Sequence, residues 1–250
     1  MTIVKRIETS VAVAAIIGLA VVASTFLFGR SVVSVFRIRH GDKSIAVTGS
    51  VKRRIVSDHI VWTATIAGRG PDLATAYRSM SSGVPKTMTF LSEKGIDPKT
   101  ITVSAVRIRE IHPKDKDGHL IEETISMYSV EQDIRVESND VEKVAAVSRE
   151  STKLIEDGIQ IQSEAPLYLY TKLGDLKIQL LAEASKDARL RADQIASNTG
   201  SKVTQLNSAR MGVMQINAAN ESTTSGDGMN DTTSLEKDVL AIVSASFGVE

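Results

Sequence analysis

The sequence LEKDVLAIVSASFGV, residues 235–249, carries the most regular strand pattern of the chain. From Val239 to Val249 every odd-numbered residue is apolar, whereas the residues between them include Ser244 and Ser246. An apolar residue at every second position is typical of a β-strand that packs one face against a core. The pattern therefore predicts a final strand over residues 235–249.

The residues before this strand predict a loop, another strand and the longest helix. Segment 217–234 is rich in Asn, Ser, Thr and Gly and has little to bury, so we expect a mobile hairpin loop, preceded by a strand over 202–216. Residues 173–199 place apolar side chains at helical spacing, and Gly200 follows as a C-terminal signal. The alanines of this stripe would allow close approach to a sheet. The stripe consists of Leu173, Leu176, Leu180, Ala184, Ala188, Ala192 and Ile195.

The beginning of the folded part predicts two strands and a helix. Strand patterns over 44–51 and 56–68 flank the basic run Lys52-Arg53-Arg54, which is typical of the end of a hairpin. A helical pattern over 71–94 follows. Gly83 and Pro85 lie inside it, and we expect them to kink or interrupt the helix.

The middle of the chain completes the order of elements. A polar turn at 113–118 joins a second strand pair, and a helix that ends at Asp157-Gly158 comes next. The order β-β-α-β-β-α-β-α-β-β lacks the regular alternation of a doubly wound fold, which predicts an α+β fold with mixed, largely antiparallel sheets and helices packed on one side. In this middle part the predicted strands are 100–109, 120–136 and 159–170, and the helix begins after Asn139 or Asp140. The whole predicted domain covers residues 44–250.

The N-terminal segment predicts a membrane anchor. No residue from Thr9 to Gly29 is charged, and as a helix these residues would span about 31 Å, which is close to the hydrocarbon thickness of a bilayer. We therefore expect a short tail and one transmembrane helix over residues 1–30, followed by a juxtamembrane connector over 31–43.

Two other interpretations of this segment stay open. Lys5 and Arg6 could be the basic region of a cleaved signal peptide, with small residues at 20–24 near the cleavage site, or the segment could be a buried core helix. The apolar stretch continues through Phe28, past any such site, which favours an uncleaved anchor. Basic residues after the stretch favour the opposite orientation, but a short basic N-terminal region acts as a start-transfer signal, so we expect the domain outside the cytoplasm.

Composition excludes several classes of function. Lys plus Arg equals Asp plus Glu at 30 each, so the chain has no overall field that would attract nucleic acid. Aromatic residues make up 4% of the chain, which leaves few rings for stacking on bases or sugars. The chain has no cysteine, and this excludes disulfides, thiolate nucleophiles and zinc–thiolate sites.

The histidines do not form a metal-binding pattern. His112 and His119 flank the turn at 113–118 and could approach each other across a hairpin, but solvated histidines explain the same positions. The chain has two others, His40 and His59, and no pair has the spacing of a helical metal site. We expect no metal and no cofactor.

Glu131 and Asp133 are the candidate acid–base residues. They point to the same side of a predicted strand that begins with Glu122-Glu123, and a cleft that perturbed their pKa values could make them a catalytic pair. A solvated polar strand face explains them equally, and the sequence has no GxSxG, P-loop or strand–turn–helix GxGxxG motif. We therefore predict no catalytic, cofactor-binding or metal-binding residues.

Two further features suggest contacts with other molecules. The run Lys52-Arg53-Arg54 could contact anionic lipid or a neighbouring subunit, although a solvated hairpin end is the simpler interpretation. The strand over 235–249 could pair within the domain or, at a sheet edge, with another copy.

Four stretches together resemble the SIMPL-domain family, which includes bacterial periplasmic and envelope proteins. They are Ile45–Ser50 (IAVTGS), Tyr128–Val136 (YSVEQDIRV), Glu183–Ala192 leading to Gly200, and the final strand, and the resemblance covers residues 44–249. It implies a periplasmic or envelope protein with α/β layers and no known catalysis. It also implies a tendency to form large homo-oligomers, and it supplies no catalytic residues.

These observations predict a non-enzymatic envelope protein, held in the bacterial inner membrane by its N-terminal helix, whose periplasmic domain self-assembles. One alternative is a tethered module that binds a ligand or captures envelope proteins by edge pairing. A hydrolase that uses Glu131 or Asp133 is the third hypothesis. The expected partners are membrane lipid, further copies of the chain and other envelope proteins, and nucleic acid is not among them.

Overall fold

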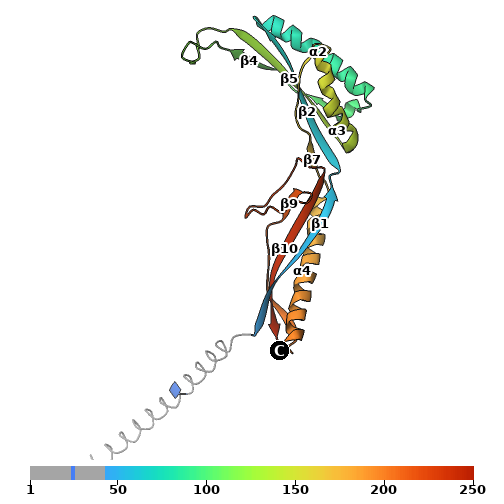
Figure 1. Cartoon of the computed structure of the whole chain (residues 1–250), viewed down its shortest axis with the longest axis vertical. Coiled ribbons are helices and arrows are strands. Elements are labelled where there is room, and N and C mark those ends of the chain that lie inside the picture. The colour runs from blue at the N-terminus through green and yellow to red at the C-terminus, as the bar shows by residue number, and fades with distance from the viewer. Residues whose placement is uncertain (1–23, 26–42) are drawn as a thin grey trace, which may run out of the picture. The chain divides into compact units, whose positions relative to one another are not determined.

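The computed structural model describes residues 24–25 and 43–250 (Figure 1). Nearly all of the predicted anchor and of the connector over 31–43 lies outside these residues. Within the described part, no helix is both long and apolar enough to span a bilayer. The chain groups into two compact units: the first holds residues up to Thr48, Ala188–Arg210 and Ser244–Glu250, and the second holds Gly49–Asp187 and Met211–Val243.

One sheet, sheet B, lies in the second unit and has the strand order β3-β5-β2-β6, with β4 beside β5 and β7 beside β2. Strand β2 pairs antiparallel with β5, β6 and β7, and β5 pairs antiparallel with β3 and β4. Because β5 lies between β2 and β3, which precede it in sequence, the sheet and its two helices have the split β-α-β-β-α-β topology of ferredoxin-like folds. The strands are β2 (His59–Gly70), β3 (Ile101–Val103), β4 (Arg107–Ile111), β5 (Met127–Ser138), β6 (Gln160–Ser163) and β7 (Leu167–Leu169).

Helices α2 (Leu73–Glu93) and α3 (Val141–Glu150) pack on one face of sheet B, where they bury Trp62, Ile66 and Ile134 completely (Figure 1). Short 3-10 turns lie at Pro98–Thr100 and Ser151–Ile155. Helix α2 approaches β2 so closely that a Cβ atom at Gly68 would lie 2.3 Å from the carbonyl oxygen of Ala76. Glycine is therefore required at this contact.

Helix α2 continues without a break from Leu73 to Glu93, so the predicted interruption at Gly83 and Pro85 is wrong. Asp72 caps its first turn by accepting a hydrogen bond from the backbone N–H of Thr75 at 2.9 Å. A Cβ atom at Gly83 would lie 2.9 Å from Ile66 Cγ2. This glycine serves close packing against the sheet.

The other sheet, sheet A, has the order β1-β10-β8, with β9 also paired to β10. Helix α4 (Leu173–Asn198) covers β10 with the predicted stripe of alanines. The prediction is wrong at the end of the stripe, where Ile195 is 46% exposed and Ala196 is buried. Ala184 packs with Val239 and Val243 in the second unit, and Ala188 packs with Phe247 in the first. The strands are β1 (Ser44–Val56), β8 (Val203–Met211), β9 (Gln215–Ala218) and β10 (Glu236–Val249).

The α+β class and its antiparallel sheets are confirmed, but the predicted first hairpin is wrong. Strand β1 continues through Lys52-Arg53-Arg54 and pairs with β10, whereas β2 belongs to sheet B. The alternation of burial continues across the basic run, because Arg53 is half-buried like Val51, on the same face as the buried Ile55, whereas Lys52 and Arg54 are exposed. Three predicted strands are each divided: 100–109 into β3 and β4, 159–170 around Pro166, which has no N–H to donate, and 202–216 at Gly212–Met214.

Candidate functional site

The predicted acid–base residues form ion pairs across strands β4 and β5. Arg107 donates to both carboxylate oxygens of Asp133, and Arg109 donates to Glu131 at 2.9 Å. The Arg107 guanidinium holds the pKa of Asp133 below its usual range. A lowered pKa is the opposite of what a general acid requires, and it also weakens the carboxylate as a base. Glu122-Glu123 lie in a turn before β5 and do not begin that strand.

The described histidines do not share a site. His112 Nδ1 lies 3.0 Å from the carbonyl oxygen of Thr124, and His119 Nδ1 lies 3.5 Å from an oxygen of Asp115. His59 contacts Asn139 at 2.8 Å. His40 lies outside the described residues. No group of three or more His, Asp or Glu side chains within the described ranges could hold a metal ion.

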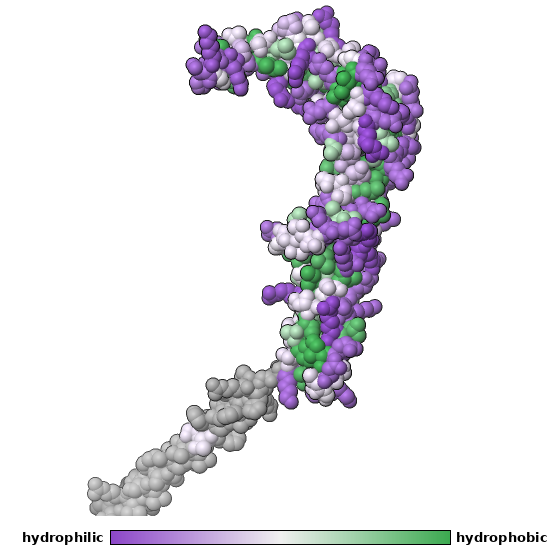
Figure 2. All heavy atoms as spheres, viewed as in Figure 1, coloured by the Kyte–Doolittle hydropathy of each residue, from purple (hydrophilic) through white to green (hydrophobic). Residues whose placement is uncertain are grey.

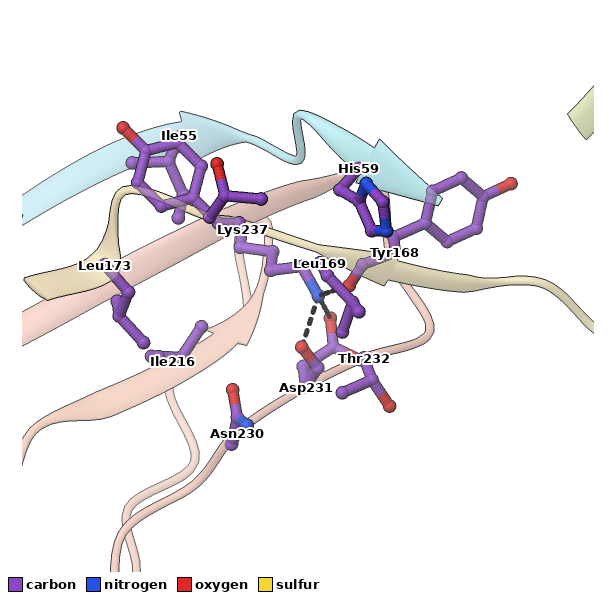
Figure 3. Close-up of a pocket in the computed structure, with 12 residues that line it drawn as sticks. Ile55, His59, Tyr168, Leu169, Leu173, Ile216, Asn230, Asp231, Thr232 and Lys237 are labelled. Atoms are coloured by element: carbon purple, nitrogen blue, oxygen red, sulfur yellow. Dashed lines mark hydrogen bonds and ion pairs between the residues drawn. The ribbon is translucent and has the colours of Figure 1, made fainter. Parts of the chain in front are cut away.

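A cavity of about 300 Å³ in the second unit contains a buried lysine (Figure 3). Lys237, at the start of β10, is 2% exposed. Its ammonium donates to the carbonyl oxygen of Tyr168 at 2.9 Å and to that of Asp231, and it lies 3.8 Å from Asp231 Oδ2. The lysine thereby connects β10, β7 and the loop that precedes β10.

The two charges in this cavity compensate each other. Burial lowers the pKa of Lys237. For Asp231, burial by itself would raise the pKa. Hydrogen bonds from the backbone N–H and the hydroxyl of Thr233, at 2.8 and 2.7 Å, have the larger effect, so the pKa of Asp231 is lowered. The carboxylate therefore stays ionised beside the ammonium. Because two backbone carbonyls accept from the lysine, its geometry is that of a structural link.

A second hollow of about 560 Å³, also in the second unit, is lined largely by flexible apolar side chains. Met211, Val213 and Met229 are each between 39% and 50% exposed. Lys177 and Asp227 lie at the same hollow, which gives it one group of each charge. Methionine side chains adapt to apolar partners of different shapes. The hollow is therefore suited to apolar groups without a fixed outline.

The outer edge of β1 is closed by side chains of α4. The backbone N–H of Ser50 donates to Asp187 Oδ2 at 2.8 Å. Arg53 donates to Gln179 Oε1 at 2.8 Å and to Glu183. The three α4 residues are spaced by four and share one face of the helix. Asp187 thereby occupies a backbone donor that a further strand would need.

The other residues of the basic run are also paired. Asp238 accepts from Lys52 at 2.8 Å, from Arg54 at 2.9 and 3.1 Å, and from the backbone N–H of Asn220 at 2.9 Å. Asp238 is 3% exposed, and the bonds from Arg54 and Lys52 hold its pKa well below the usual range. The prediction of a solvated hairpin end is therefore wrong, because these cations bind carboxylates of their own domain.

The outer edge of β8 is open. Among the described strands β8 pairs with β10 alone, and every residue of β8 except Val203 is exposed. Arg189 of α4 donates to the carbonyl oxygens of Val203 and Thr204 at 3.1 and 2.8 Å. Beyond Thr204, no described side chain bonds to the backbone of residues 205–211. The strand has no proline and one charge, Arg210, so it lacks the usual protection of an edge.

Apolar side chains reach the surface of β8. Leu206 is 54% exposed and Met211 is 49% exposed. On the face drawn in Figure 2, hydrophobic residues also appear at the surface along sheet A, among hydrophilic ones. An open strand edge that carries apolar side chains is a site where another chain can add a strand.

These features define a two-unit α+β domain with antiparallel sheets, one closed strand edge and one open strand edge. Residues 45–247 match the family described as SIMPL, protein of unknown function (DUF541). The chain belongs to this family. No curated protein matches it.

Several solved structures show weak likeness. An amidohydrolase/peptidase described as putative, from Burkholderia cenocepacia, has 17% identity and a TM-score of 0.23, over 52% of this chain and 32% of its own. An aminohydrolase, also described as putative, from methicillin-resistant Staphylococcus aureus has 19% identity and a TM-score of 0.22, over 57% of this chain and 39% of its own. The designed protein Foldit4 has 14% identity and a TM-score of 0.22, over 42% and 93%. Scores this low carry no argument about activity.

Proposed function

We propose that this protein is a non-catalytic, membrane-anchored member of the SIMPL family whose domain self-assembles into a homo-oligomer outside the cytoplasm. The observation that carries the proposal is the open edge of β8. A nine-residue strand with exposed side chains and one paired neighbour presents backbone donors and acceptors that a second chain can satisfy. Membership of a family of unknown function is compatible with a role that involves no catalysis.

The N-terminal anchor would assist this assembly. Each backbone hydrogen bond contributes about 1 kcal/mol net, so pairing along one strand yields a few kcal/mol. Association costs about 4 kcal/mol or more in lost translational and rotational freedom, so edge pairing in free solution is close to balanced. Anchoring all copies in one membrane raises their effective concentration and shifts this balance towards assembly.

The location rests on the uncharged segment from Thr9 to Gly29. Its length suits one crossing of a bilayer, and Lys5 and Arg6 before it suit a start-transfer signal. We therefore propose the bacterial inner membrane, with the domain in the periplasm. Cleavage and release into the periplasm is the alternative location.

A second candidate function is a tethered binding module of the cell envelope. The hollow lined by Met211, Val213 and Met229 favours it, because such a surface can accept apolar groups of a protein or a small molecule. In this case a foreign segment, and not another copy, would occupy the domain. Cross-linking in whole cells would recover such a partner.

The mass of the full chain in mild detergent tests the assembly proposal. We expect light scattering, corrected for bound detergent, to give a defined multiple of the 26.9 kDa chain that is retained on moderate dilution. A monomer at every concentration would contradict self-assembly and favour the tethered binding module.

A further inference from the structure

We propose that the contact between copies is an antiparallel pairing of β8 with β8 of a second copy. This inference rests on the proposed self-assembly and names the surface that carries it. It would join the A sheets of two copies through their open edges. The contact would be isologous, because the same strand is offered by both copies.

The lengths of the available edges favour β8 as its own partner. Strand β8 has nine residues, whereas the edge strands β3, β4, β6 and β7 of sheet B have between three and five. A partner strand on one of those edges would leave part of β8 unpaired. Among the described strands, β1 is the other long edge, with 13 residues.

Strand β1 cannot accept a strand along its whole length. Its backbone donor at Ser50 is bonded to Asp187, and Arg53 is held by Gln179 and Glu183 beside it. An incoming strand would have to displace these bonds to pass Ser50. Head-to-tail pairing of β8 with β1 is therefore limited to the five residues from Ser44 to Thr48.

The side chains of β8 are compatible with self-pairing. An antiparallel arrangement centred on Asn207 places the two copies of Arg210 at opposite ends, so the one charged residue of the strand does not face itself. The same arrangement makes Leu206 and its copy diagonal neighbours, about 7–8 Å apart. Since Leu206 is 54% exposed in the single chain, the contact would remove apolar surface from water.

A charge exchange at Leu206 tests the contact. In Leu206→Lys, like charges lie near each other in a self-paired dimer, and we expect self-association to weaken about tenfold. We expect the same of Leu206→Asp. An equimolar mixture of the two variants should regain the mass of the unmodified protein, because each lysine then has an aspartate as its diagonal neighbour.

Leu190→Lys is the matched control. Leu190 lies on α4, is 59% exposed and is the same residue type, but it is not part of a strand edge. We expect this variant to keep the mass of the unmodified protein. Circular dichroism melting of all three variants shows whether the fold is intact, and substitutions at such exposed positions change stability by about 0.5 kcal/mol or less.

The outcomes separate the inference from the proposed function. Self-pairing is supported if both Leu206 variants form assemblies of lower mass than the unmodified protein and their mixture regains the mass of the unmodified assembly. Loss without recovery means that β8 pairs with a different surface, and no loss means that the contact lies elsewhere. Either result overturns the inference while self-assembly stands. An unmodified protein that is monomeric throughout overturns both.

Discussion

Strands β1 and β8 are the two outer strands around β10 in sheet A, and they differ in how their free edges are treated. On β1, Asp187 of α4 binds the N–H of Ser50, and charged side chains line the strand. On β8, Arg189 binds only the first two carbonyls, and the rest of the edge is open. The same helix therefore supplies a side chain to both edges but closes one of them.

The difference shows that closing an edge depends on a few charged side chains and not on strand length. The longer strand is the closed one. Partly exposed ion pairs such as Arg53–Glu183 stabilise a fold by about 0–1 kcal/mol, so their main effect at β1 is to prevent pairing. Substitutions that remove these charges at β1, or add a charge to β8, should therefore change how the two edges differ.

The largest effect is expected at Asp238, which holds the basic run of β1. Asp238→Ala leaves Lys52 and Arg54 without their carboxylate and Asn220 N–H without its acceptor, so we expect a loss of about 3 kcal/mol in the free energy of unfolding. Urea denaturation measures it. Glu236→Ala is the control, because Glu236 is exposed and 3.7 Å from Arg54. Equal midpoints for the two variants would contradict this account.

The contribution of Asp238 should depend on pH. Its folded pKa lies well below the unfolded value of about 3.9, so the stability it provides is complete above that value and is lost as the pH falls towards the folded pKa. The difference in unfolding free energy between the unmodified protein and Asp238→Asn should therefore be constant near neutral pH and decrease below about pH 4. A difference that stays constant down to pH 2 would show that the carboxylate has an ordinary pKa.

A smaller effect on stability is expected from opening the β1 edge. Asp187→Ala removes a charged acceptor from Ser50 N–H and should cost about 1–2 kcal/mol. It should also make this edge available, so that mass in detergent increases beyond that of the unmodified protein. Lys186→Ala, at the neighbouring exposed position on α4, is the control. Unchanged mass in Asp187→Ala would mean that Asp187 does not protect the edge.

The smallest effect on stability is expected for Leu206→Lys on β8. Leu206 is 54% exposed, and its replacement should change the free energy of unfolding of the single chain by about 0.5 kcal/mol or less. Chemical denaturation of protein diluted below its association range measures this value. A loss of several kcal/mol would show that Leu206 packs within its own chain.

Local periodicity in the sequence was enough to predict the α+β class, the final strand and the alanine stripe of α4. It could not tell which strands pair. The patterns of β1 and β2 are adjacent and suggested a hairpin, but β1 pairs with β10, which begins at Glu236. Strand partners depend on packing between distant segments, and no single segment contains that information.

The same limit applied to the functional surfaces. Lys52 and Arg54 looked solvated in the sequence because their partner, Asp238, lies more than 180 residues away along the chain. Lys237 could have been found, since it continues the odd-numbered, inward-facing series of Val239 and Ala241. The open edge of β8 had no sequence signal of its own, because openness depends on which strands lie beside it.

Hydrogen exchange of backbone amides can show directly whether a second copy covers β8, when the assembled protein is compared with its dissociated form in detergent. If β8 is the edge that a second copy covers, amides within residues 203–211 exchange slowly in the assembly and faster after dissociation. The Ser50 amide, bonded within its own chain, stays equally protected in both. Unchanged exchange over residues 203–211, or a change confined to β1, would contradict the account.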